Sequence, residues 1–181
     1  MGRDKALLEL DGATLVERAA RVLDEVAPEV WLACGSETRY VTLGRRLILD
    51  QETGAGPLAG IAAALGELDD DGWLCVLACD MPRVEAELFD RLLERAHADA
   101  LDVCLATTSR GWEPMCAVYH ARCRTSVRAA LARGERRMVG FWKDGEDLRV
   151  GSIAVTEEDG VNLNTPAEYE QELAAREKNE P

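Results

Sequence analysis

Residues 73–80 read WLCVLACD, a nearly unbroken apolar run that ends in an aspartate. A run that is hydrophobic at both odd and even positions is typical of a strand buried on both faces, as in a parallel sheet. Met81 and Pro82 follow, and proline makes the chain turn because its ring fixes φ and it has no amide hydrogen. The stretch therefore predicts a central strand that carries the Asp80 carboxylate to one edge of a sheet.

Segments typical of strands and helices alternate on both sides of this stretch. Further strand-like apolar runs cover residues 30–34, 45–50, 101–107, 115–119 and 148–156. Apolar residues at helical spacing cover residues 15–26, 57–68, 84–98, 124–134 and 165–177. This alternation favours a Rossmann-like α/β fold, an open and mostly parallel sheet with helices on both faces.

The composition fits one globular domain, which we predict over residues 1–176 with a frayed tail over 177–181. With 21 basic and 34 acidic side chains the net charge is 21 − 34 = −13, which repels nucleic acid and anionic membranes, so neither is an expected partner. No apolar stretch approaches the roughly 20 residues of a membrane span. Charged residues rather than an apolar signal segment follow Met1, so we expect a cytoplasmic protein.

The six cysteines are expected to be reduced, buried thiols. Four of them lie in apolar, strand-like runs, where a free cysteine behaves as a small hydrophobic residue. No Cys-x-x-Cys pair occurs, and the chain has two histidines. A zinc site is therefore not expected.

Candidate site residues follow from the predicted sheet, because such sheets bind ligands beyond the carboxyl ends of their strands. Asp80 and Asp50 each end a strand-like run, and a loop follows the run over 30–34. A rigidly held carboxylate such as Asp80 suits Mg²⁺, which binds through one or two carboxylates and the phosphates of a substrate. The alternatives are that Asp80 caps a helix or is a solvated acid in a turn.

Four further motifs carry polar or glycine residues. GAGPLAG (54–60) places glycines where a loop meets a helix, so backbone amides could approach an anion or a carbonyl group, although an ordinary tight turn reads the same way. Lys5 is a cation that could offset the negative net charge near a phosphate, or a solvated lysine. GERR (134–137) offers two arginines that could bind phosphate, or a surface turn. In NLNTP (162–166), helix capping explains Thr165 but not both asparagines.

Taken together and in this order, these pieces resemble the molybdenum cofactor guanylyltransferase family of Rossmann-like nucleotidyltransferases. The matching stretches are MGRDKALLELDG (1–12), DQETGAGPLAG (50–60), LACDMP (77–82), GERR (134–137) and NLNTPAE (162–168). The resemblance spans essentially the whole chain. It implies that the terminal phosphate of the molybdopterin cofactor attacks the α-phosphorus of GTP, that pyrophosphate leaves, and that a guanine dinucleotide form of the cofactor results.

The resemblance also implies roles for individual residues. Asp80 would hold Mg²⁺, and Lys5 would neutralise the charge that develops on the triphosphate. The nucleotide would further contact Gly35, Asp50, Gly56 and Gly60. The molybdopterin side would be formed by Arg137, Asn162 and Asn164, of which Asn164 would also be near the metal. Implied partners are GTP, the molybdopterin cofactor, and molybdoenzymes or their chaperones that receive the product.

The chain departs from the family pattern at two places. Gly35 stands where the family often has an asparagine, so that amide contact is lost or Ser36 replaces it. The family also begins with a strand and a loop of the type LAGGxSxRMGxDK, of which residues 1–5 retain the end. A central strand that buries about five apolar side chains would contribute on the order of 7–15 kcal/mol, comparable to the net stability of a domain. We therefore expect Met1 to be an internal methionine of a longer natural chain.

Two other functions remain open from the sequence. The first is a cytidylyltransferase that acts on the same cofactor, which a comparison of GTP with CTP would distinguish. The second is a non-catalytic binding protein that keeps the fold without the phosphate loop. Pyrophosphate release from GTP, compared between the natural protein and Asp80→Ala, would distinguish that one.

Overall fold

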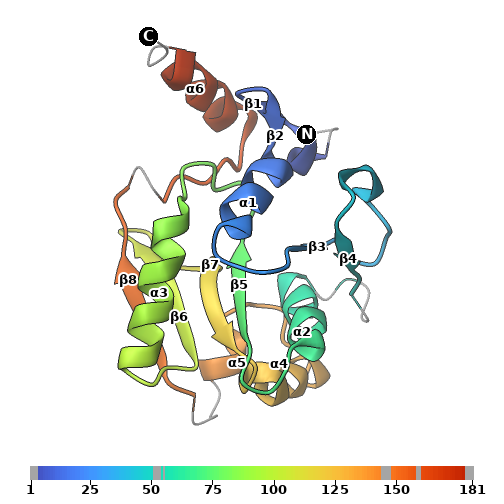
Figure 1. The fold of residues 1–181 in the computed structure, drawn as a ribbon, viewed down its shortest axis with the longest axis vertical. Coiled ribbons are helices and arrows are strands. Elements are labelled where there is room, and N and C mark those ends of the chain that lie inside the picture. Colours follow the sequence, from blue (N-terminus) through green and yellow to red (C-terminus); the bar gives the residue numbers. More distant parts are fainter. Residues whose placement is uncertain (1–3, 51–53, 55, 144–147, 158–159, 178–181) are drawn as a thin grey trace.

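The computed structural model describes residues 4–50, 54, 56–143, 148–157 and 160–177 (Figure 1). Of the predicted tail, residues 178–181 lie outside these ranges. Within them, no helix combines the length and the hydrophobicity needed to span a membrane.

A mixed four-stranded sheet forms the centre of the molecule, in the order β5-β7-β6-β8. Its strands are β5 (Trp73–Leu77), β6 (Val103–Thr108), β7 (Gly111–His120) and β8 (Val150–Ala154). β7 is antiparallel to both β5 and β6, and β8 is parallel to β6. The carboxyl ends of β5, β6 and β8 therefore point to the same edge of the sheet.

Helices cover both faces of this sheet, as predicted (Figure 1). On one face α2 (Pro57–Glu67), α4 (Cys123–Ala132) and α5 (Gly140–Lys143) bury a core against side chains such as Leu105 and Tyr119. On the other face α3 (Ala86–Ala98) packs against side chains that alternate with these along β6 and β7. Both the odd and the even positions of β6 and β7 are therefore buried, each set against helices on one face of the sheet. This confirms the predicted α/β architecture.

Smaller elements surround the sheet and complete the fold. β3 (Trp31–Ala33) and β4 (Arg46–Ile48) form a separate parallel pair beside it, and β1 (Glu9–Leu10) and β2 (Ala13–Thr14) form a short hairpin. The remaining elements are α1 (Leu15–Asp24), α6 (Pro166–Glu177) and the 3₁₀ turns η1 (Lys5–Leu7) and η2 (Val41–Leu43). A capping box starts α1, because the side chains of Thr14 and Glu17 each accept a hydrogen bond from the other's backbone amide. At the other end of the chain, α6 lies beside the β1–β2 hairpin (Figure 1).

The opening prediction for residues 73–80 was wrong in one respect. β5 does lead to Asp80, but its neighbour is the antiparallel β7, and all five of its residues are half-buried. The Ala78 amide donates to the Met115 carbonyl, and the Ala121 amide donates to the Gly72 carbonyl. With this register, the peptide groups of Trp73, Cys75 and Leu77 point away from β7, toward an edge on which the described residues place no strand. The strand expected ahead of Met1 stays a prediction.

The prediction of buried thiols is confirmed for four of the six cysteines. All six thiols are free, four of them are buried, and the other two are partly buried. Burial raises the pKa of Cys75 to about 11 and that of Cys116 to about 12, so these side chains stay neutral. No group of three or more His, Cys, Asp or Glu side chains in the described ranges could hold a metal.

Candidate active site

Three predicted site residues from distant parts of the chain meet beyond the carboxyl end of β5. The Lys5 ammonium donates to Asp80 Oδ2 at 2.7 Å and to Asn164 Oδ1 at 3.3 Å. The side chains of the ion pair are 23% and 22% exposed, so a ligand can reach them while the protein still restricts their motion. A cation, a carboxylate and an amide therefore share one small site.

Local structure fixes each of these three residues. Lys5 opens η1, whose first turn is capped by the Asp4 carboxylate accepting from the Ala6 amide at 3.1 Å. Asp80 is held by its backbone, because its carbonyl accepts from the Leu163 amide at 2.8 Å. Asn164 lies two residues before α6, and its amide donates to Glu168 at 2.8 Å.

One oxygen of Asp80 fits a metal ion. Oδ2 accepts from Lys5, but Oδ1 is buried and has no hydrogen-bond partner in the described part of the chain. A buried carboxylate oxygen without a partner costs free energy unless something binds it. Because Mg²⁺ needs few protein oxygens when phosphates complete its shell, Asp80, with the neighbouring Asn164 oxygen, suits a phosphate-bound divalent cation.

Asp4 connects this cluster to the loop after β3. The Tyr40 hydroxyl donates to Asp4 Oδ2 at 2.7 Å, and Arg39 lies 3.6 Å from the same oxygen. Arg39 also donates to the Cys34 carbonyl at 2.8 Å. Burial and the adjacent Asp4 raise the pKa of Tyr40, so the phenol stays protonated and keeps donating. Sequence reasoning missed these contacts, and the signal that could have found them is the acidic residue between two cations in GRDK.

Three predicted nucleotide-binding residues form a second cluster. The Asp50 amide donates to the Gly35 carbonyl at 2.8 Å. A Cβ built on Gly60 would lie 3.5 Å from Asp50 Oδ1 and 3.5 Å from the Ala33 Cβ. The first turns of α2 therefore pack closely against the Asp50 carboxylate. Burial raises the pKa of Asp50.

Gly56 and the GERR segment meet at the start of α2. Gly56 is the N-cap of this helix with φ 69°, a conformation that favours glycine, and Pro57 follows at the first helical position. A Cβ at Gly56 would lie 3.6 Å from the Arg136 carbonyl oxygen. The start of α2 and the backbone of Arg136 in GERR are thus neighbours.

The remaining two predicted residues bond neighbours in their own segments. The exposed Arg137 bonds Glu135 through its amide at 2.8 Å and through Nη2 at 3.1 Å. Hydrogen bonds from Arg137 lower the pKa of Glu135 to about 2. Asn162 donates to the Gly160 carbonyl at 3.5 Å, and its own carbonyl accepts from the Asn164 amide.

Comparisons with known proteins agree with this arrangement. A family model described as "MobA-like NTP transferase domain" matches residues 1–147. The chain is 33% identical over 180 residues to a molybdenum cofactor guanylyltransferase of Shewanella sp. (strain W3-18-1), a match that covers 97% of this chain and 89% of that protein.

Solved structures give the same result. Molybdopterin-guanine dinucleotide biosynthesis protein A from Archaeoglobus fulgidus superposes with a TM-score of 0.79 at 25% identity, over 98% of this chain and 92% of that one. Rv0371C from Mycobacterium tuberculosis H37Rv, solved as a complex with manganese, shares the fold at 17% identity with a TM-score of 0.67, over 94% of this chain and 91% of that one. The chain therefore belongs to the MobA-like NTP transferase family and is a nucleotidyltransferase.

Proposed function

We propose that the protein transfers GMP from GTP to the molybdopterin-bound molybdenum cofactor. A terminal phosphate oxygen of the cofactor forms a bond to the α-phosphorus of GTP. The bond from that phosphorus to the bridging oxygen of the β-phosphate breaks, and pyrophosphate leaves with the bonding electrons. The observation that carries the proposal is the ion pair of Lys5 and Asp80, whose second carboxylate oxygen is buried and finds no partner among the described residues.

Nucleotidyltransferases generally use a divalent metal, and we infer Mg²⁺ for this protein. Asp80, through Oδ1, and Asn164 would hold it. When bound, the metal supplies positive charge to the phosphate oxygens. Lys5, 2.7 Å from Asp80, would neutralise the charge that builds up on the leaving pyrophosphate. Positioning and charge neutralisation of this kind require no covalent intermediate on the enzyme.

Asp50 is the candidate for recognising guanine. An ionised carboxylate only accepts hydrogen bonds, and the Watson–Crick edge of guanine offers two adjacent N–H groups, whereas that of cytosine offers one beside an acceptor. Gly60 lets the backbone of α2 lie close to the Asp50 carboxylate and adds no side chain that would crowd a base bound there. Gly35 and Gly56 line the approach through their backbones.

The GERR and NLNTP segments are proposed for the other substrate. Asn162 is two residues from Asn164 in the sequence, and the exposed Arg137 carries a planar guanidinium suited to phosphate. Molybdoenzymes or their chaperones are proposed as the proteins that receive the guanine dinucleotide product.

A comparison of nucleotides tests the proposed function. Pyrophosphate release is measured with Mg²⁺, the molybdopterin cofactor, and either GTP or CTP. We expect kcat/KM for GTP to exceed that for CTP by at least about 100-fold, because mismatched polar groups next to the partly buried Asp50 carboxylate are penalised. Equal values would overturn the guanine assignment, and a folded protein that releases no pyrophosphate from either nucleotide would support the non-catalytic alternative.

Replacing Gly60 by alanine tests the base pocket. The added methyl group makes only ordinary contacts with the protein, at 3.5 Å, and alanine favours a helix interior over glycine by about 1 kcal/mol. We therefore expect an unchanged or higher melting temperature. KM for GTP should rise about tenfold, equivalent to 1.4 kcal/mol of binding, because the methyl group occupies space beside Asp50.

Gly66→Ala is the matched control for this variant. Gly66 lies in the same helix, and its added Cβ would meet the Arg128 Nη2 at 3.3 Å, the far end of a flexible side chain. This variant should alter stability without changing KM for GTP. If the Gly60→Ala variant keeps the KM for GTP of the natural protein, the base binds elsewhere.

A further inference from the structure

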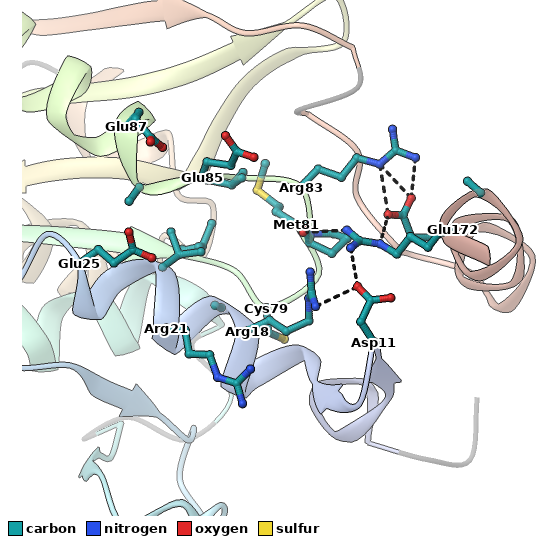
Figure 2. Close-up of a pocket in the computed structure, with 18 residues that line it drawn as sticks. Asp11, Arg18, Arg21, Glu25, Cys79, Met81, Arg83, Glu85, Glu87 and Glu172 are labelled. Atoms are coloured by element: carbon teal, nitrogen blue, oxygen red, sulfur yellow. Dashed lines mark hydrogen bonds and ion pairs between the residues drawn. The ribbon is translucent and has the colours of Figure 1, made fainter. Parts of the chain in front are cut away.

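A buried carboxylate lies behind the active site, outside the residues considered so far. The Glu172 side chain, on α6, is 3% exposed. Arg83 approaches it with Nη2 at 2.8 Å from Oε2, and Arg176 with Nε at 2.8 Å from Oε1. Figure 2 shows the Arg83 guanidinium pointing toward the Glu172 carboxylate, and both residues line the same pocket. Burial alone raises the pKa of Glu172, but the hydrogen bonds and charges of Arg83 and Arg176 together outweigh it. The net pKa is below its ordinary value, so the side chain is ionised.

The two arginines extend the network to other segments. Arg176 donates to the Pro82 carbonyl at 3.3 Å and bonds Asp11 at 2.6 Å. Arg18, on α1, donates to the same Asp11 carboxylate at 3.1 Å, and Asp11 and Arg18 lie together in Figure 2. Glu172 thereby ties α6 to the loop after β5 and to the turn of the β1–β2 hairpin.

These three segments are the ones that present the active-site residues. Pro82 follows Asp80 by two residues, Asn164 precedes the first residue of α6 by two residues, and Lys5 lies in the turn ahead of β1. A small core also joins them, in which Leu163 packs with Leu10 and Leu15.

We propose that Glu172 is a positioning residue: through Arg83 and Arg176 it holds the three segments in the register at which Lys5, Asp80 and Asn164 meet. The inference rests on the proposed function. Buried ion pairs often add little net stability, because desolvation offsets their attraction. Net stability therefore does not explain why such a network converges on the loop that carries Asp80. Accurate placement of the active-site groups does explain it, because small misplacements of reacting groups slow catalysis strongly.

Glu172→Gln tests the proposal, because it keeps the shape of the side chain and removes its charge. We expect the metal concentration that gives half-maximal activity to rise about tenfold and kcat to fall about tenfold, as the Asp80 loop moves relative to Lys5. The same variant should bind Mn²⁺ more weakly in the presence of GTP, measured by the paramagnetic resonance of the free ion.

Two further variants separate positioning from stability. Arg83→Gln removes one arginine whose side chain is 30% exposed, so it should fold and show the same shift in metal dependence, even if Glu172→Gln does not fold. Asp99→Asn breaks an exposed pair with Arg95 on α3 and should leave the metal dependence unchanged. Natural metal dependence and kcat in folded Arg83→Gln would overturn the proposal.

The Mn²⁺ measurement also distinguishes this proposal from the proposed function. If the natural protein releases no pyrophosphate but Glu172→Gln or Arg83→Gln still weakens Mn²⁺ binding, the proposed function fails and the positioning role stands. If pyrophosphate release is normal and neither variant changes Mn²⁺ binding or metal dependence, the positioning role fails and the function stands.

Discussion

Asp80→Asn is expected to lower kcat for pyrophosphate release by about 10²–10³-fold, the usual cost of removing one preorganised electrostatic group. Asparagine preserves the shape of the side chain and keeps one oxygen, but it removes the negative charge that a divalent cation requires. The fold should survive, because the carbonyl that bonds the Leu163 amide belongs to the backbone. Initial rates at saturating GTP and cofactor, with a melting curve for each protein, measure both effects.

Direct binding of Mn²⁺ extends the Asp80 experiment beyond activity. With GTP present, the Asp80→Asn protein should bind Mn²⁺ far more weakly than the natural protein does. Asp90→Asn serves as the control, since Asp90 is an exposed carboxylate on α3. If Asp80→Asn keeps nearly all activity and Mn²⁺ binding, Asp80 is a solvated acid in a turn and the proposed metal site is wrong.

Local sequence signals predicted much of the fold. The helices that follow Thr14 and Thr165 each start with a capping box. Such a motif spans only four residues, so it can be recognised in the sequence. Pro57 and Pro166 each open a helix, as their fixed φ favours. The direction and length of β7 were not predictable in this way. Which strand pairs with β5 depends on contacts between residues some 40 positions apart, such as Leu74 and Tyr119, and these leave no local pattern.

The same distinction applies to the candidate site. Asp80 and Asp50 could be proposed because each ends an apolar run at a sheet edge, and the family resemblance added Lys5 and Asn164. The structure adds that Lys5 and Asn164, from opposite ends of the chain, contact each other. Glu172 gave no signal, because it reads as one more acid in a charged helix. Its role depends on burial by segments that are distant in sequence, which composition and periodicity do not encode.

Lys5→Met should change two properties in opposite directions. Without nucleotide, Lys5 lies 2.7 Å from Asp80 and neutralises it, so a cation gains little by approaching that carboxylate. Removing the ammonium leaves the Asp80 charge without its partner, and a nearby uncompensated charge attracts a cation more strongly. We therefore expect the free protein to bind Mn²⁺ about tenfold more tightly, a change of about 1.4 kcal/mol.

Turnover of the same variant should fall by about 10²-fold, because the charge that would stabilise the leaving pyrophosphate is gone. A lysine that only balanced Asp80 would predict tighter Mn²⁺ binding with normal turnover, and a solvated lysine would predict no change in either quantity. Arg95→Met, which removes a cation from an exposed pair on α3, should leave both at natural values. Tighter metal binding combined with slower chemistry would mean that Lys5 exchanges partners, from Asp80 in the free protein to phosphate in the complex with GTP.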